Sequence, residues 1–200
     1  MAIYGGTFDP IHKAHLQIAA EAVRQFRLDR VLFIPAANPP HKQATHTPYF
    51  HRLRMAQIAC QHEPRFVVSN LEEGVTKSYS YYTILRVRAT LDPHDELFFL
   101  LGADAFAEID TWHRSREVLE LVDFLVVSRP GHRYQVPPGA RVHRLDSLAL
   151  AVSSSAIRAQ LARGETPEQV PPEVLAYIRE HHLYQAPQES KGVQAGSSPA

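Results

Sequence analysis

The sequence has little of what marks several classes of protein. One cysteine in 200 residues, Cys60, allows no internal disulfide and no cysteine metal site, so we expect a core residue in a reducing compartment. The 21 basic and 21 acidic residues cancel and are interspersed, which disfavours nucleic-acid and anionic-membrane partners. No basic signal segment follows Met1, and apolar runs such as Leu97 to Leu101 are too short to span a bilayer. We therefore expect a cytoplasmic protein that acts on small molecules and binds neither membrane nor nucleic acid.

What the sequence does have is an alternation of short apolar runs with amphipathic stretches. The runs beginning at Ala2, Val31, Phe66, Leu97 and Phe124 are expected to be strands, and the stretches between them carry apolar residues at helical spacing. Near-continuous apolar strands separated by helices indicate a parallel sheet that is covered on both faces. The predicted fold is α/β, a doubly wound, Rossmann-like parallel sheet in a single domain.

The carboxyl-terminal third adds shorter elements. We expect a short strand over 142–145, a helix that is capped by the serines at 153–155 and stops at Gly164, and a final helix from about Pro172. Residues 185–200 are rich in Ser, Gly, Gln and Pro with almost no apolar anchor, so we expect this tail to be disordered. The prediction is one domain over residues 1–184 followed by a disordered tail over 185–200.

The residues after the first strand have the character of a phosphate site. Gly5 and Gly6 allow positive backbone torsions and close approach of main-chain amides to a ligand, Thr7 adds a hydroxyl, and the next helix points its amino end at the loop. His12 and His15 are three residues apart, so both can face one phosphate from the first turn of that helix. A protonated or donor imidazole there would stabilise charge on phosphorus. A metal-binding pair and a purely structural pair are the alternatives.

The string from Gly5 to His15, GGTFDPIHKAH, resembles the signature of adenylyltransferases with a His-x-Gly-His motif, specifically the nicotinate mononucleotide adenylyltransferase family. The resemblance extends from about residue 3 to Tyr184. In that family the two histidines bind the ATP phosphates and stabilise the transition state, which implies catalytic roles for His12 and His15. Ala14 departs from the family, which usually has glycine there. The loop residues implied in ATP binding are Gly5, Gly6, Thr7 and Phe8.

Two later segments resemble further parts of the family's ATP site. Residues 152–158 are similar to its Ser-Ser-Thr-x-Ile-Arg segment, with Ser155 in the threonine position. Hydroxyls, amides and a guanidinium at one helix end suit a phosphate by chemistry alone, whereas an ordinary N-cap with a surface arginine is the alternative. The carboxylate of Asp104, after a predicted strand, could accept ribose hydroxyls or cap the next helix. The residues implied in ATP binding here are Asp104, Ser153, Ser154, Ser155, Ile157 and Arg158.

Four segments resemble the family's acceptor site. They are the loop at 38–42, the helix carrying Arg52, the Ser-Tyr-Ser at 78–80, where the family has Ser-Tyr-Thr, and the stretch 110–113 with the chain's one tryptophan. A flat indole is suited to stacking on a pyridine ring. Tyr82 stands where the family commonly has Asp. The residues implied in acceptor binding are His41, Lys42, Arg52, Ser78, Tyr79, Ser80, Trp112 and His113.

The resemblance implies transfer of AMP from ATP to nicotinic acid mononucleotide, which gives deamido-NAD and pyrophosphate in NAD biosynthesis. Mg²⁺ is expected as a cofactor bound mainly through ATP, and no residue is assigned as a metal ligand, because the sequence has no evident carboxylate cluster for one. Nicotinamide mononucleotide or phosphopantetheine as acceptor, and a homo-oligomeric state, remain open. A fragment related to class I aminoacyl-tRNA synthetases and a catalytically silent nucleotide-binding regulator are the alternatives from other classes. The short, neutral chain without a Lys-Met-Ser-Lys-Ser-like loop disfavours the first of these.

Overall fold

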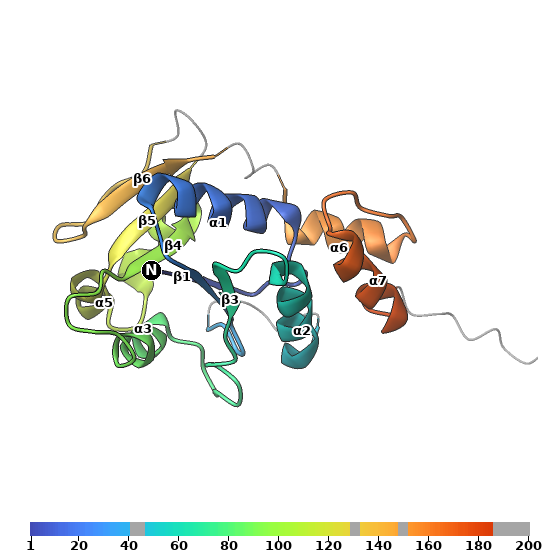
Figure 1. Cartoon of the computed structure of the whole chain (residues 1–200), viewed down its shortest axis with the longest axis horizontal. Helices are drawn as coiled ribbons and strands as arrows, with labels where there is room; N and C mark the ends of the chain where they lie inside the picture. The colour runs from blue at the N-terminus through green and yellow to red at the C-terminus, as the bar shows by residue number, and fades with distance from the viewer. Residues whose placement is uncertain (41–46, 129–132, 148–151, 186–200) are drawn as a thin grey trace, which may run out of the picture.

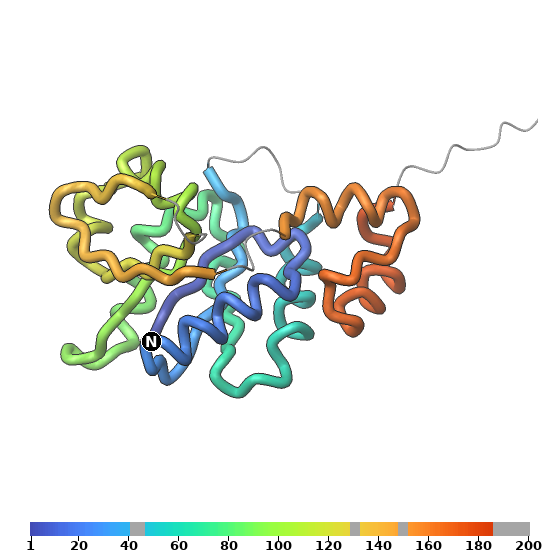
Figure 2. The backbone as a smooth tube through the Cα atoms, turned by 90° about the horizontal axis from the view of Figure 1, so that it is seen from above, coloured from blue at the N-terminus to red at the C-terminus, as the bar shows by residue number. Residues whose placement is uncertain are grey.

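The computed structural model describes residues 1–40, 47–128, 133–147 and 152–185 (Figures 1 and 2). The strands are β1 (Ala2–Gly6), β2 (Val31–Pro35), β3 (Phe66–Val68), β4 (Phe98–Gly102), β5 (Asp123–Ser128) and β6 (Val142–Asp146). The helices are α1 (Lys13–Phe26), α2 (Tyr49–Cys60), α3 (Ser80–Arg88), α4 (Ala103–Ala107), α5 (Ser115–Leu121), α6 (Ser154–Ala162) and α7 (Pro172–Glu180), with a 3-10 turn η1 (Ile109–Thr111). Each segment in which we expected a strand or helix contains one.

The six strands form one sheet in the order β3-β2-β1-β4-β5-β6, and every neighbouring pair is parallel. This arrangement confirms the predicted doubly wound α/β fold. The strand order reverses between β1 and β4, and open α/β sheets bind ligands beyond the carboxyl ends of the strands at such a point. The loops that follow β1 and β4 are therefore the first place to look for a site.

Helices cover both faces of the sheet and produce two apolar cores. Helices α1 and α2 pack on one face, with α6 and α7 joining the same core beside them at the end of the molecule (Figure 1), and α3, α4 and α5 pack on the other face. Alternate residues of one strand serve the two cores: Tyr4 points into the first and Ile3 into the second. The sequences of these strands are nearly continuous apolar runs because both faces of the strands are buried. Cys60 lies in the first core, as expected.

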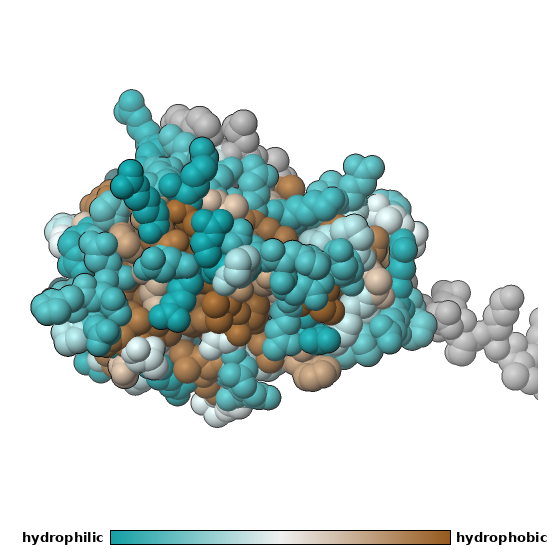
Figure 3. Space-filling view, in the orientation of Figure 1, coloured by the Kyte–Doolittle hydropathy of each residue, from teal (hydrophilic) through white to brown (hydrophobic). Residues whose placement is uncertain are grey.

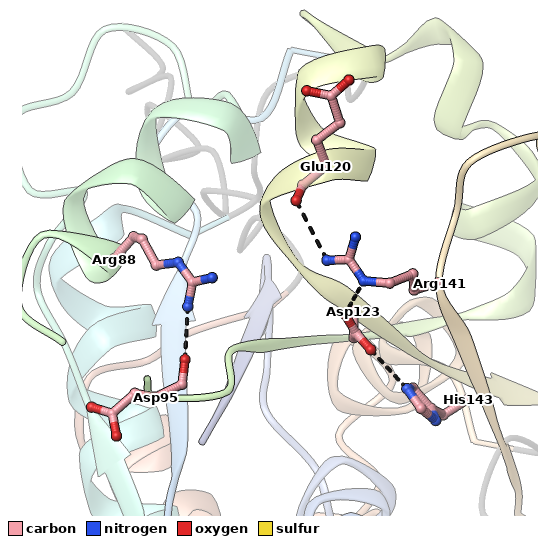
Figure 4. Close-up of polar contacts among 6 residues, drawn as sticks. All are labelled: Arg88, Asp95, Glu120, Asp123, Arg141 and His143. Carbon is pink, nitrogen blue, oxygen red and sulfur yellow. Dashed lines mark hydrogen bonds and ion pairs between the residues drawn. The ribbon is translucent and has the colours of Figure 1, made fainter. Parts of the chain in front are cut away.

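Polar contacts connect segments at the amino-terminal ends of β4, β5 and β6, which is the end of the sheet away from the phosphate loop (Figure 4). Asp123, the first residue of β5, accepts from Nε of Arg141 at 2.5 Å and lies 2.9 Å from Nε2 of His143 in β6. Ahead of β4, Nη1 of Arg88 donates to the main-chain oxygen of Asp95 at 2.8 Å. The first pair joins the start of β5 to the start of β6, and the second joins the end of α3 to the segment before β4.

No helix within the described ranges has the length and apolar character needed to cross a membrane.

Candidate active site

The two histidines of the predicted phosphate loop lie side by side where α1 begins. His12 is the N-cap residue, with extended backbone (φ −144°), and His15 is in the first turn. Their imidazole rings stack with centroids 3.7 Å apart and planes 23° from parallel. The main-chain amide of His12 donates to Nδ1 of His15 at 3.2 Å. The predicted placement of both imidazoles on one side of the helix start is confirmed.

Burial sets the charge of His12. Its side chain is 4% exposed, and this burial lowers its pKa to about 4, so the imidazole is neutral at pH 7. Its buried Nδ1 faces the main-chain amide of His15 in a capping-box arrangement but makes no well-formed hydrogen bond within the described residues. A buried polar atom without a partner is uncommon in folded proteins and fits a position that a ligand would satisfy. The sequence allowed either a protonated imidazole or a neutral one that donates a hydrogen bond. The lowered pKa favours the neutral form of His12 in the free protein.

The metal-pair alternative receives no support from the surrounding side chains. Within residues 1–40, 47–128, 133–147 and 152–185, no group of three or more His, Cys, Asp or Glu side chains could hold a metal ion. A zinc site would need three or four such ligands.

The glycines of the loop make room for an aromatic side chain. A Cβ on Gly6 would lie 3.0 Å from the ring of Phe8, and one on Gly5 would lie 3.4 Å from Phe99. Neither glycine has a positive φ; that torsion falls on Phe8, at 49°. The positive torsion that Gly5 and Gly6 allow is therefore not used at either residue; close packing against Phe8 explains Gly6, whereas a Cβ at Gly5 would make only an ordinary contact with Phe99. Phe8 is 2% exposed, and its ring meets that of His15 edge-on at 5.1 Å, so it supports this histidine.

The second predicted phosphate segment lies against the first. Ser153 is the N-cap of α6 and accepts from the amide of Ala156 at 3.3 Å. Oγ of Ser154 donates to the main-chain oxygen of Pro10 at 3.1 Å, and Nη1 of Arg158 donates to that of Asp9 at 2.7 Å. Two segments about 145 residues apart in sequence thus meet at the amino ends of α1 and α6.

The other residues assigned to ATP occupy different environments. Ser155 is exposed, whereas Ile157 is 2% exposed and packs in the first core, so only its main chain can reach a nucleotide. Asp104 is exposed in the first turn of α4. Its alternative role as an N-cap is wrong, because Gly102 occupies that position.

A pocket of about 250 Å³ opens beside the phosphate loop at the carboxyl ends of β1 and β4. Its lining includes residues 5–7, expected from the sequence to bind ATP, and residues 78–80 and 112–113, expected to bind the acceptor. Trp112 is half-buried and meets Phe99 edge-on at 5.8 Å. His113 stacks on Tyr79 at 4.4 Å. Figure 3 shows hydrophobic residues gathered at the centre of one face of the molecule with hydrophilic residues around them. The pocket thus has aromatic walls and reaches the glycine loop of β1, which leads to the paired histidines; His12 and His15 themselves do not line it.

The structure contradicts the acceptor-binding assignment of Arg52. Its side chain is fully buried (0% exposed) and does not line the pocket, although two of its partners, Thr7 and Ala36, do. It donates to the main-chain oxygens of Thr47 (3.0 Å), Thr7 (2.8 Å), Ala36 (2.7 Å) and Ala37 (3.2 Å). The guanidinium therefore joins the loops after β1 and β2 to the start of α2, and no open face remains for a substrate phosphate. Two other assigned acceptor residues, His41 and Lys42, lie outside the described residues.

Sequence reasoning missed a carboxylate in the pocket wall. Glu72 is 5% exposed; its Oε1 accepts from Oγ1 of Thr83 at 2.7 Å and its Oε2 accepts from the amide of Ala37 at 3.2 Å. It follows the carboxyl end of β3, and the rule that singled out Asp104 after β4 could have found it. Tyr184 was also missed: its hydroxyl donates to Oδ1 of Asp9 at 2.6 Å, and no motif in the sequence pointed to that contact.

Comparisons with known proteins agree with this fold and site. The family model described as cytidylyltransferase-like matches residues 3–160. A protein of Solibacter usitatus named "Probable nicotinate-nucleotide adenylyltransferase" is 60% identical over 185 residues, which cover 92% of this chain and 98% of that one. A protein of the same name from Exiguobacterium sibiricum is 44% identical over the same shares of the two chains.

A solved structure supports the fold at greater evolutionary distance. The Plasmodium falciparum nicotinic acid mononucleotide adenylyltransferase complexed with NaAD superposes with a TM-score of 0.75 at 20% identity, covering 92% of this chain and 96% of that one. From the match over most of the chain and the 60% identity to a curated relative, the chain belongs to the nicotinate-nucleotide adenylyltransferase family of cytidylyltransferase-like enzymes.

Proposed function

We propose that this protein transfers the adenylyl group of ATP to nicotinic acid mononucleotide, with formation of deamido-NAD and release of pyrophosphate in NAD biosynthesis. The observation that carries the proposal is the pocket in which Trp112, His113 and residues 78–80 face the glycine loop of β1. An aromatic-walled space of this size suits a pyridine ring. Its place beside His12 and His15 would bring an acceptor phosphate to the ATP phosphates.

The chemistry requires alignment and charge neutralisation more than proton transfer. An oxygen of the acceptor phosphate attacks the α-phosphorus of ATP, and the bond from that phosphorus to the oxygen bridging to the β-phosphorus breaks, so pyrophosphate leaves with the electron pair. A phosphate monoester is already ionised at pH 7, so no general base is needed. The protein contributes by holding two polyanions in line and placing hydrogen-bond donors where charge develops.

The proposed roles follow from the positions of the residues. His12 and His15 would donate to the α-phosphate, and the loop formed by Gly5, Gly6, Thr7 and Phe8 would cradle the nucleotide. Ser153, Ser154, Ser155, main-chain groups near Ile157, and Arg158 would hold the leaving pyrophosphate at the start of α6. Asp104 would accept ribose hydroxyls. Ser78, Tyr79, Ser80, Trp112 and His113 would bind the nicotinate group, with His41 and Lys42 near the acceptor phosphate.

Mg²⁺ enters the proposal as a partner of ATP. The part of the chain that the structure describes offers no cluster of carboxylate and histidine ligands for a metal ion. Mg²⁺ would be held mainly by the phosphates of ATP and by water, and it would neutralise negative charge on the leaving pyrophosphate.

The direct test is pyrophosphate release from ATP with three acceptors: nicotinic acid mononucleotide, nicotinamide mononucleotide and 4′-phosphopantetheine. We expect the highest kcat/KM with the first. A clear preference for phosphopantetheine would refute the aromatic acceptor, and a preference for the amide would move the assignment to nicotinamide mononucleotide. Replacement His15→Ala tests the catalytic assignment: loss of one such donor should lower kcat by about 100-fold or more, and an unchanged rate would refute it.

A further inference from the structure

Hydrogen bonds from the carboxyl-terminal part of the chain hold the segment 9–13, which contains His12. Four hydrogen bonds join residues 9–13 to that part of the chain: Arg158 Nη1 to Asp9 O (2.7 Å), Ser154 Oγ to Pro10 O (3.1 Å), Lys13 N to Gln169 O (2.8 Å) and Tyr184 Oη to Asp9 Oδ1 (2.6 Å). The first two partners are on α6, the third lies between α6 and α7, and the last follows α7. Figures 1 and 2 show this helix pair beside the start of α1, at the end of the molecule opposite to β5 and β6.

The contact between Tyr184 and Asp9 differs from the other three. Arg158 and Ser154 belong to the proposed phosphate site, whereas Tyr184 lies beyond the last helix and outside every ligand-binding assignment. Asp9 is 4% exposed, so its carboxylate depends on partners inside the protein. Burial and the neighbouring Asp9 raise the pKa of Tyr184, so the hydroxyl keeps its proton and stays a donor. A short bond from a hydroxyl to a carboxylate is among the stronger hydrogen bonds in proteins.

Residues 7–13 are also held from the other side. Nη1 of Arg52 donates to the main-chain oxygen of Thr7 at 2.8 Å. Phe8, whose ring packs on His15, lies between these attachments at Thr7 and Asp9, and His12 follows three residues after Asp9. Movement of Asp9 would therefore move both the His12 backbone and the ring that packs on His15.

We propose that Tyr184 is a positioning residue, whose hydrogen bond to Asp9 holds the loop so that His12 and His15 meet the α-phosphate. This inference rests on the proposed adenylyl transfer and adds to it a contribution from the end of the chain. It predicts an effect on the chemical step and none on acceptor affinity, because the hydrogen bonds of the Tyr184 hydroxyl within the described residues go to Asp9 and Thr47, neither of which lines the pocket. Misplacement of reacting groups by about an ångström can lower a rate by up to about 100-fold.

The test compares two tyrosine-to-phenylalanine variants from the same end of the chain. Tyr184→Phe removes the hydroxyl that binds Asp9. Tyr177→Phe removes one that lies 2.9 Å from Nδ1 of His51 on α2, away from residues 9–13. In the intact protein with ATP and nicotinic acid mononucleotide, we expect kcat to fall by about tenfold or more for Tyr184→Phe, with KM for the acceptor unchanged. Tyr177→Phe should keep the wild-type kcat. Equal kcat values in wild type and Tyr184→Phe, or equal losses in both variants, would overturn the proposal.

A spectroscopic readout separates this inference from the proposed function. In protein labelled with ¹⁵N-histidine, Tyr184→Phe should shift the imidazole signals of His12 and His15, whereas Tyr177→Phe should shift those of His51 and leave the pair unchanged. If wild type releases no pyrophosphate with any acceptor, the proposed function fails and these spectra still test the positioning. Unmoved His12 and His15 signals in Tyr184→Phe would overturn it.

A second variant covers the case in which Tyr184→Phe does not fold. Asp9→Asn keeps an oxygen that can accept from Tyr184 and removes the charge. It should lower kcat a few-fold with an unchanged acceptor KM, because a neutral acceptor makes a weaker bond. An unchanged kcat in this variant would overturn the proposal.

Discussion

Burial changes the chemistry of two basic side chains in this protein, His12 and Arg52. The His12 imidazole, with a pKa lowered to about 4, is neutral in the free protein and meets ATP as a hydrogen-bonding group. A bound polyanion would favour its charged form, so its charge would rise as ATP arrives. Burial of Arg52 instead turns a residue type that often binds phosphate into a connector of main-chain oxygens.

The lowered pKa of His12 predicts a pH dependence of stability. The unfolded chain binds a proton with an ordinary histidine pKa of about 6.5, and the folded protein does so only near pH 4, so stability is lost as the pH falls between these values. From His12 alone, we expect the free energy of unfolding to drop by about 2 kcal/mol between pH 7.5 and pH 5. Urea unfolding of wild type and His12→Asn at both pH values measures this drop in the free energy of unfolding. The same drop in both proteins would show that His12 is not the group responsible.

Because Arg52 is buried, we expect its replacement to lower stability, whereas its assignment from the sequence predicted weaker binding of the acceptor. Arg52→Met removes donors from several buried carbonyls and should lower the free energy of unfolding by about 3 kcal/mol or more. Arg54 on the same helix is exposed, and its Nη1 donates to Oε1 of Gln57 at 3.4 Å, so Arg54→Met should change stability by about 0.5 kcal/mol or less. Urea unfolding compares the two. A stable Arg52→Met protein with a raised acceptor KM would restore the binding role.

At the scale of helices and strands, the sequence predicted the elements because two-sided burial leaves a strong pattern. The runs Leu97 to Leu101 and Phe124 to Val127 are apolar at every position because alternate residues enter different cores. Strand β6 is less apolar, with Leu145 buried and Arg144 exposed, and it was predicted from a shorter pattern. Sequence spacing therefore sufficed for element type and for the layered fold.

The site was predicted only where residues formed a motif within one segment. The glycine loop, the serines of α6 and Trp112 each belong to a short, recognisable string, and the pocket brings the first and last of these together. Glu72, Arg52 and the contact of Tyr184 with Asp9 depend on how separate loops fold over one another. A single sequence gives the spacing of residues along a helix or strand, and it does not give the partners that another loop will supply.

The start of α6 allows a prediction for a whole element. Ser153 caps this helix by accepting from the amide of Ala156, so Ser153→Ala should lower the free energy of unfolding by about 1 kcal/mol. Ser153→Thr, which keeps a capping hydroxyl at the same position, provides the matched control and should leave stability within about 0.5 kcal/mol of wild type. Thermal unfolding followed by circular dichroism compares them. Equal losses in both variants would mean that the cap does not stabilise α6.

At the scale of the whole molecule, the two cores are coupled because they share strands. Side chains of β1 and β4 enter both cores, so neither core can form without the same backbone. We expect a single cooperative transition, with Trp112 fluorescence, which reports on the second core, coinciding with circular dichroism of the whole chain.

The extent of that cooperative unit can be tested at the end of the chain. The sequence predicts that the folded domain ends at residue 184, and the hydrogen bond from Tyr184 to Asp9 makes this tyrosine the residue at which to test that boundary. A chain ending at Gln185 should unfold at the wild-type temperature, because the segment it lacks has almost no apolar residue to bury. A chain ending at Leu183 loses a partly buried ring together with its hydrogen bond to a buried carboxylate, so its midpoint should fall by roughly 5 °C. Differential scanning calorimetry separates the two lengths. If the chain ending at Gln185 already unfolds at the lower temperature, the residues beyond it stabilise the fold and the domain extends past Tyr184.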